Sequence, residues 1–144
     1  MLRTLFRRGL PALLIMLMLP GLVRAELAVI ANPHNRLHGV DLDTIARVYR
    51  GEIRHLSNGV RITPVDQPRG SPLRKHFYEK VLHMNEKAVS RYWSKYRFTG
   101  KRKPPMVLSS DAEVKRWVAS HPDAIGYISG DSLDDSVELL QIIP

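Results

Sequence analysis

Short apolar runs and helical apolar spacings alternate along the chain after residue 26. Residues 27–31 (LAVIA) form a continuous apolar run that ends at Asn32 and Pro33, which predicts a buried strand followed by a loop. Short runs rich in strand-forming residues predict four further strands, at residues 61–65, 106–108, 124–129 and 137–142.

The segments between these runs have the periodicity of helices. Apolar residues recur at spacings of three and four from Leu42 to Tyr49, directly after the capping residue Asp41. Residues suited to begin three more helices are Ser71 with Pro72, Asn85, and Ser110 with Glu113. Because strands alternate with helices, we expect an α/β domain with a mostly parallel sheet flanked by helices.

The first 25 residues have the composition of a bacterial secretory signal. Three arginines precede an uncharged run of 15 residues, and Val23 and Ala25 stand at the minus-three and minus-one positions of a small-residue cleavage site. A helix that crosses a bilayer needs roughly 20 apolar residues, so this shorter run favours cleavage after Ala25 over a retained anchor. We therefore expect residues 26–144 to form a single domain in the periplasm.

Composition limits the chemistry available to the exported chain. There is no cysteine, which excludes disulfides, thiolate metal ligands and cysteine nucleophiles. The full chain has 22 Lys and Arg against 14 Asp and Glu, but four of the basic residues lie in the first 25 positions, so the exported chain carries +4 instead of +8. Export and this modest charge argue against nucleic acid as a partner.

The segment ITPVDQPRGSPLR at residues 62–74 carries the most informative chemistry. A glycine before a helix start presents free backbone amides and the positive end of the helix dipole, which favour an oxyanion. Arg69 and Arg74 can add guanidinium contacts, and Ser71 can add a hydroxyl donor. The segment therefore predicts an oxyanion site around Gly70 to Arg74; the alternative is that Ser71 only caps the helix.

Charge also gathers in residues 91–103, where six basic residues are interleaved with four aromatic ones. We expect the aromatic residues to face the core at helical spacing and the charges to face solvent. Lys101, Arg102 and Lys103 form a candidate basic surface for an anionic ligand, a lipid head group or an acidic partner protein.

The six histidines are too dispersed to indicate a metal centre. His34 and His38 lie four residues apart but beside Pro33 and Gly39, whereas zinc sites bring three or four clustered ligands. No HExxH, nucleophile-elbow, P-loop or dinucleotide-binding motif is present. We therefore expect no metal, no cofactor and no enzymatic activity.

Three segments taken in order carry a family resemblance: LDTIARVYRGE at 42–52, ITPVDQPRGSPLRKHF at 62–77 and VASHPDAIGYIS at 118–129. Together they resemble the phosphate-binding-protein-like branch of the type II periplasmic solute-binding proteins, and SPLRKHFYEKVL and FTGKRKPP are similar to its small single-lobe members. The resemblance covers residues 27–129. It implies a single-lobe periplasmic-binding-protein-like fold, inorganic phosphate as ligand and a phosphate ABC transporter as the setting.

The family's phosphate loop is only partly kept. Full-size receptors have an arginine, an aspartate and the run Gly-Ser-Gly-Thr there, and only Gly70 and Ser71 carry over. Gln67 and Arg69 stand at other loop positions, with Arg69 in place of the aspartate that accepts a hydrogen bond from protonated phosphate. The candidate ligand-binding residues are thus Gln67, Arg69, Gly70, Ser71 and Arg74, with reduced discrimination of phosphate from sulfate.

The sequence predicts a periplasmic phosphate or oxyanion binding protein, or an accessory substrate-binding component of a phosphate ABC transport system. An ABC transporter permease or another envelope protein is the expected partner. The main alternative is a protein-interaction module that retains the fold without a ligand site. A homodimer that restores a two-lobed cleft would combine ligand binding with protein interaction. A metal-handling periplasmic protein is the third possible function.

The signal segment makes a direct prediction about the exported protein. Because Ala25 ends the small-residue cleavage site, mass spectrometry of protein purified after export should give Glu26 as its first residue. A first residue of Met1 would instead indicate a protein that keeps its N-terminal segment as a membrane tether.

Overall fold

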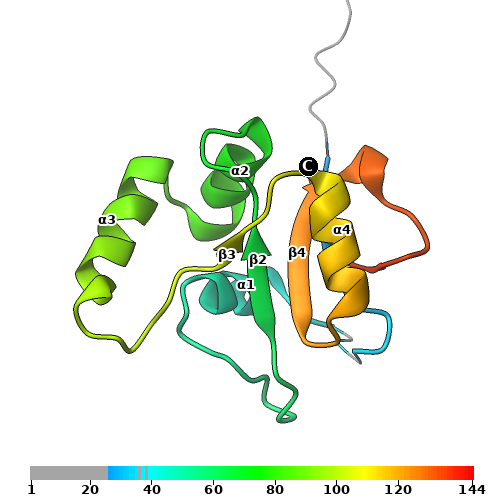
Figure 1. The fold of residues 1–144 in the computed structure, drawn as a ribbon, viewed down its shortest axis with the longest axis horizontal. Coiled ribbons are helices and arrows are strands. Elements are labelled where there is room, and N and C mark those ends of the chain that lie inside the picture. Colours follow the sequence, from blue (N-terminus) through cyan, green and yellow to red (C-terminus); the bar gives the residue numbers. More distant parts are fainter. Residues whose placement is uncertain (1–25, 36, 38) are drawn as a thin grey trace, which may run out of the picture.

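The computed structural model describes residues 26–35, 37 and 39–144, which form a five-stranded sheet with helices on both faces (Figure 1). The strands are β1 (Leu27–Ala31), β2 (Thr63–Asp66), β3 (Met106–Val107), β4 (Ala124–Ser129) and β5 (Glu138–Ile143). The helices are α1 (Leu42–Tyr49), α2 (Pro72–Phe77), α3 (Glu86–Arg97) and α4 (Asp111–Ser120). A π-helical turn η1 (Tyr78–Leu82) continues α2, and a 3₁₀ turn η2 (Gly130–Ser132) follows β4.

The predicted signal segment at residues 1–25 lies outside the described residues, as do Arg36 and His38. Among the residues that the structure describes, no helix is long and apolar enough to cross a membrane.

The strand order is β3-β2-β4-β1-β5. β2 is parallel to β3 and β4, whereas β1 is antiparallel to both of its neighbours, β4 and β5. Four strands therefore run in one direction and β1 runs against them. The α/β class predicted from the sequence is confirmed, and β1 is the exception in a sheet whose other strands share one direction. An apolar run does not encode the direction of a strand, so the sequence could not identify this exception.

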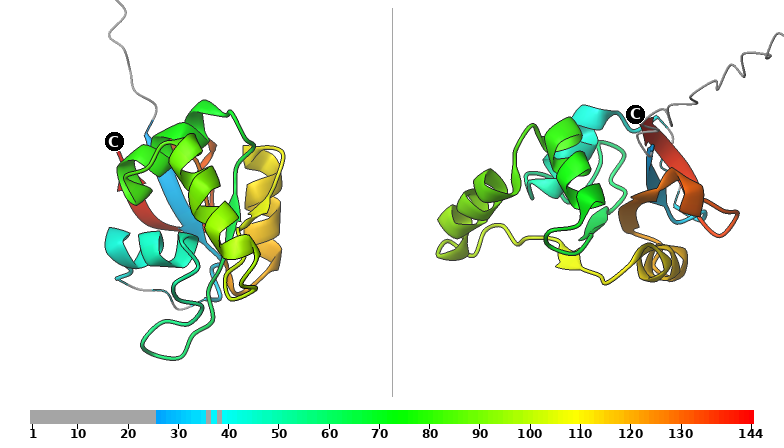
Figure 2. Two further views of the ribbon diagram at one scale, coloured as in Figure 1. Left: turned by 90° about the vertical axis from the view of Figure 1, so that its left-hand side faces the viewer. Right: turned by 90° about the horizontal axis from the view of Figure 1, so that it is seen from above.

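Helices lie on both faces of the sheet (Figure 2), and an apolar layer lies under the helices of each face. One face packs against α1, α2, η1 and α3, and the other packs against α4. β1 shows why both layers are needed: Leu27, Val29 and Ala31 enter the first layer, while Ala28 and Ile30 enter the second. A strand covered on both faces is apolar throughout and does not alternate, which explains the continuous LAVIA run.

Each predicted helix start is capped by a side-chain oxygen that accepts from a backbone amide three residues on. The caps are Asp41 for α1, Ser71 for α2, Asn85 for α3 and Ser110 for α4. Polar capping residues thus set the helix starts.

Helix α3 projects from the rest of the protein (Figure 1), and Val89 is its one fully buried residue. The face predicted to be apolar is the less exposed one, with Tyr92, Trp93 and Tyr96 only partly covered. Such light packing leaves room for a pocket between α3 and the sheet.

Candidate functional site

A pocket of about 460 Å³ lies where β2 and β3 end, between α3 on one side and α2 with η1 on the other. Asp66 and Arg69 line it from the end of β2 and the loop that follows, and Arg74 and Tyr78 line it from α2 and η1. Residues of α3 and of the segment 104–107 complete the lining. The pocket therefore lies beside the segment in which the sequence predicted an oxyanion site.

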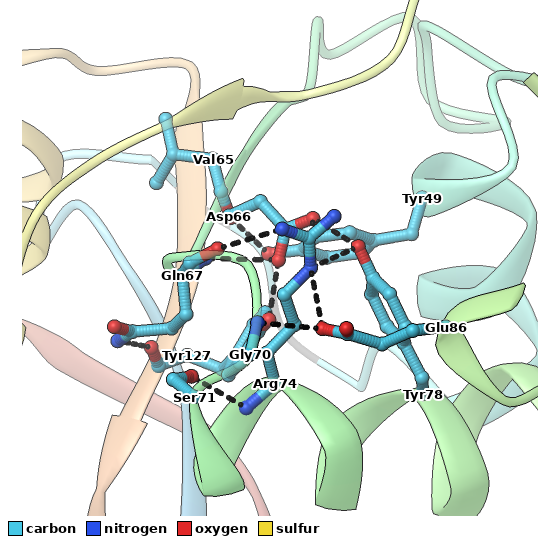
Figure 3. Close-up of polar contacts among 10 residues, drawn as sticks. All are labelled: Tyr49, Val65, Asp66, Gln67, Gly70, Ser71, Arg74, Tyr78, Glu86 and Tyr127. Carbon is cyan, nitrogen blue, oxygen red and sulfur yellow. Dashed lines mark hydrogen bonds and ion pairs between the residues drawn. The ribbon is translucent and has the colours of Figure 1, made fainter. Parts of the chain in front are cut away.

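The buried Asp66 carboxylate organises one wall of this pocket (Figure 3). It accepts hydrogen bonds from the Tyr78 hydroxyl at 2.6 Å, from the Tyr127 hydroxyl and from the Gln67 backbone amide at 2.9 Å. The Nε atom of Arg74 lies 3.7 Å from Asp66 Oδ2. A carboxylate is stable inside a protein only when paired in this way, so Asp66 draws these groups together.

The tyrosine hydroxyls around Asp66 are permanent donors. Burial, and then the negative charge of Asp66, raise the pKa of Tyr78 and Tyr127 above the usual value. The same two causes raise the pKa of Tyr49, whose hydroxyl donates to the Val65 carbonyl at 2.8 Å. All three rings therefore hold their protons near neutral pH and lock the end of β2 to its neighbours.

Arg74 is held by several acceptors and lines the pocket with 12% of its side chain exposed. Its Nε donates to the Tyr78 hydroxyl at 2.6 Å, and its Nη1 donates to the Gln67 carbonyl at 3.4 Å. Within the described part of the chain, no polar contact involves Nη2. The guanidinium is thus fixed in position and keeps donor capacity for an anion.

Glu86, in the first turn of α3, takes the position expected for an oxyanion. Its Oε1 accepts from the Gly70 backbone amide at 3.1 Å and lies 3.6 Å from the Nε of Arg74. Ser71 Oγ accepts from the Arg74 amide at 3.1 Å and acts as a helix cap. A carboxylate of the protein itself therefore accepts the hydrogen bond from the Gly70 amide, which the sequence analysis assigned to a bound oxyanion.

Gln67 is buried and its side chain points away from the pocket. Its Nε2 donates to Asp111 Oδ1 and to the Tyr127 carbonyl, each at 2.8 Å. Gln67 therefore joins the end of β2 to α4 and β4, and it is absent from the pocket lining. Of the five candidate ligand residues, Arg69 and Arg74 line the pocket. Gly70 and Ser71 do not line it, but each is hydrogen-bonded to a residue that does, Gly70 to Glu86 and Ser71 to Arg74.

Basic residues outnumber acidic ones in the pocket lining. The basic residues are Arg69, Arg74, Lys87 and Arg97, and the acidic ones are Asp66 and Glu86. Both carboxylates are engaged by Arg74 and other donors, whereas the exposed side chains of Arg69, Lys87 and Arg97 make no ion pair with any described residue. The pocket consequently presents net positive charge to a ligand.

The candidate basic surface at Lys101, Arg102 and Lys103 lies outside this pocket. The Arg102 Nη1 donates to the Tyr92 hydroxyl at 2.6 Å, and its guanidinium stands 4.4 Å from the centre of the Tyr96 ring. Lys103 lines a separate hollow of about 300 Å³. Arg102 therefore ties the loop to α3, which leaves Lys101 and Lys103 as the more exposed charges.

Sequence reasoning missed Asp66, Tyr78, Tyr127 and Glu86, which complete the site. A weak signal existed for Asp66, an acidic residue directly after an apolar run, but Glu86 reads as an ordinary acidic residue at a helix start. Among the described residues, no group of three or more His, Cys, Asp and Glu side chains could hold a metal ion, and His38 lies outside those residues.

The Asp66 cluster allows two tyrosine variants to be compared. Tyr78→Phe removes a donor to a buried charge, so it should lower the free energy of unfolding by about 1.5–3 kcal/mol. Tyr49→Phe removes a donor to a neutral carbonyl and should cost about 0.5–1.5 kcal/mol. Denaturant unfolding measures both, and equal losses would show that Asp66 does not depend on its hydroxyl donors.

No family model matches the chain, and no curated protein matches it either. Solved structures do match. An ABC-type phosphate transport receptor from Vibrio cholerae has a TM-score of 0.66 and 23% identity, covering 81% of this chain and 46% of that one. A Clostridium perfringens protein solved with bound phosphate has a TM-score of 0.64 and 23% identity, covering 81% and 45%.

PstS from Borrelia burgdorferi gives a TM-score of 0.61 and 17% identity, covering 81% of this chain and 47% of that one. The chain thus spans less than half the length of each of these proteins. The resemblance predicted from the sequence is confirmed at the level of the fold: the chain has the fold of the periplasmic-binding-protein-like domains found in phosphate ABC transporter substrate-binding proteins.

Proposed function

We propose that this protein binds phosphate or a similar oxyanion in the periplasm, as a binding or accessory component of a phosphate ABC transport system. The observation that carries the proposal is the pocket beside β2, where four basic residues face two engaged carboxylates. The fold shared with an ABC-type phosphate transport receptor and with a protein solved with bound phosphate adds support.

Arg74 is the residue best placed to hold the anion. Its contacts with Tyr78 and with the Gln67 carbonyl fix the guanidinium before a ligand arrives, so little side-chain entropy is lost on binding. Arg69 lies in the same lining and is free to add a second charged contact. Charge-assisted hydrogen bonds of this kind are roughly twice as strong as neutral ones.

We expect this affinity to be moderate for two reasons. Arg69, Lys87 and Arg97 line the pocket with exposed side chains, so a bound anion stays in contact with water, which weakens each charged contact. Glu86 also competes for the Gly70 amide. A permease, another envelope protein or a second copy of the chain would cover the open side.

The alternative function is a protein-interaction module that retains the fold without a ligand. One observation favours it: Glu86 already satisfies the Gly70 amide, so the fold is complete with no anion. Apolar side chains that such a module could use are exposed in the same region, namely Phe98, Met106 and Val107. Ligand-dependent stabilisation distinguishes the two functions.

Phosphate should raise the thermal midpoint of the purified protein at constant ionic strength. A ligand that binds only the folded state stabilises it by about 2.7 kcal/mol at 100 times Kd, which corresponds to several degrees for a domain of this size. Arg69→Ala should reduce this shift, whereas the matched variant Arg91→Ala, which removes an exposed charge outside the pocket lining, should preserve it. Equal small shifts with phosphate, sulfate and chloride would favour the interaction module.

Removing the competing carboxylate should strengthen phosphate binding. Glu86→Gln keeps an acceptor for the Gly70 amide and removes the negative charge beside Arg74, so we expect Kd to fall about three- to tenfold. Isothermal titration calorimetry measures this change. Glu79→Gln, on an exposed acid of η1 outside the pocket lining, is the control and should leave Kd unchanged. An unchanged Kd in Glu86→Gln would place the anion away from Gly70 and Arg74.

A further inference from the structure

The pocket lining offers two kinds of surface. Arg69 and Arg74, with two basic residues of α3, give it positive charge and hydrogen-bond donors. Trp93 of α3, Pro105 and Val107 of β3 form an apolar wall within the same lining. An inorganic anion can use only the charged surface.

The size of the pocket also favours a ligand larger than an inorganic anion. Its volume of about 460 Å³ lies within the range of roughly 300–1,000 Å³ that is typical of pockets for small organic molecules. A single tetrahedral anion beside Arg74 would leave most of this space to water. That water would lie against Trp93 and Val107, where it gains no hydrogen bonds from the protein.

The Trp93 ring is held in place, so it can act as a preformed surface. One edge of the indole packs so closely on Gly51 that a Cβ atom added there would lie 3.3 Å from Trp93 Cη2. The side chain also packs against the larger of the two apolar layers. A fixed aromatic face next to fixed donors is suited to a ligand that carries an apolar group beside its charge.

We propose that the pocket binds an organic oxyanion, a small phosphate monoester or phosphonate, in preference to inorganic phosphate. This inference rests on the proposed function, because it places the anionic group at Arg74 and Arg69. The organic group lies against Trp93, Pro105 and Val107. Binding displaces water from the apolar wall and so contributes free energy that inorganic phosphate does not gain.

Calorimetric titration of the purified protein with phenyl phosphate and with inorganic phosphate tests the inference. We expect phenyl phosphate to bind at least tenfold more tightly, which is about 1.4 kcal/mol. Equal Kd values would overturn the inference and leave the proposed function standing. The absence of binding by both ligands would overturn the inference and the proposed function together.

Two variants assign the preference to the apolar wall. Trp93→Leu should bring the two Kd values within about threefold of each other, whereas Trp117→Leu, on α4 at the opposite face of the sheet, should keep the tenfold ratio. Val107→Ser reduces the same wall at a side chain that is 51% exposed, so it tests the inference even where Trp93→Leu fails to fold. A ratio that persists in Val107→Ser and in folded Trp93→Leu would overturn the inference.

Discussion

The candidate site depends on how the protein satisfies the buried carboxylate of Asp66. It stands at the end of β2 and binds hydroxyls from η1 and β4 together with the guanidinium of Arg74. A buried charge that loses a partner destabilises a protein by several kcal/mol, so these elements cannot separate without large cost. The position of Arg74 is therefore a consequence of how the core satisfies one charge, and a fixed guanidinium is what an oxyanion site requires.

Glu86 shows how the same charges make the protein stable without a ligand. Its carboxylate faces the Gly70 amide and Arg74 from α3, a helix with Val89 as its one fully buried residue. An anion that enters the pocket competes with this contact, while Trp93, farther along α3, stays packed on Gly51. The protein thus has an internal carboxylate that a ligand can displace, beside a guanidinium fixed by β2 and η1.

Local patterns predicted the elements well because they depend on neighbours in the sequence. The LAVIA run, the Asp41 cap and the Ser71 cap all appear where the sequence places them. The site was predicted only in part. The contact of Glu86 with Gly70 joins residues 16 positions apart and depends on where α3 packs, which no local spacing encodes. The direction of β1 escaped prediction for the same reason, since its partners come from the far end of the chain.

The most direct test of the account is an NMR titration of the ¹⁵N-labelled protein with inorganic phosphate. It follows the Gly70 amide and the Nε–H groups of Arg69 and Arg74. Binding in the pocket predicts that the three signals shift together and saturate with one Kd, because all three lie in or beside one site. Shifts confined to the loop around Lys101 and Lys103, or shifts that never saturate, would contradict the account.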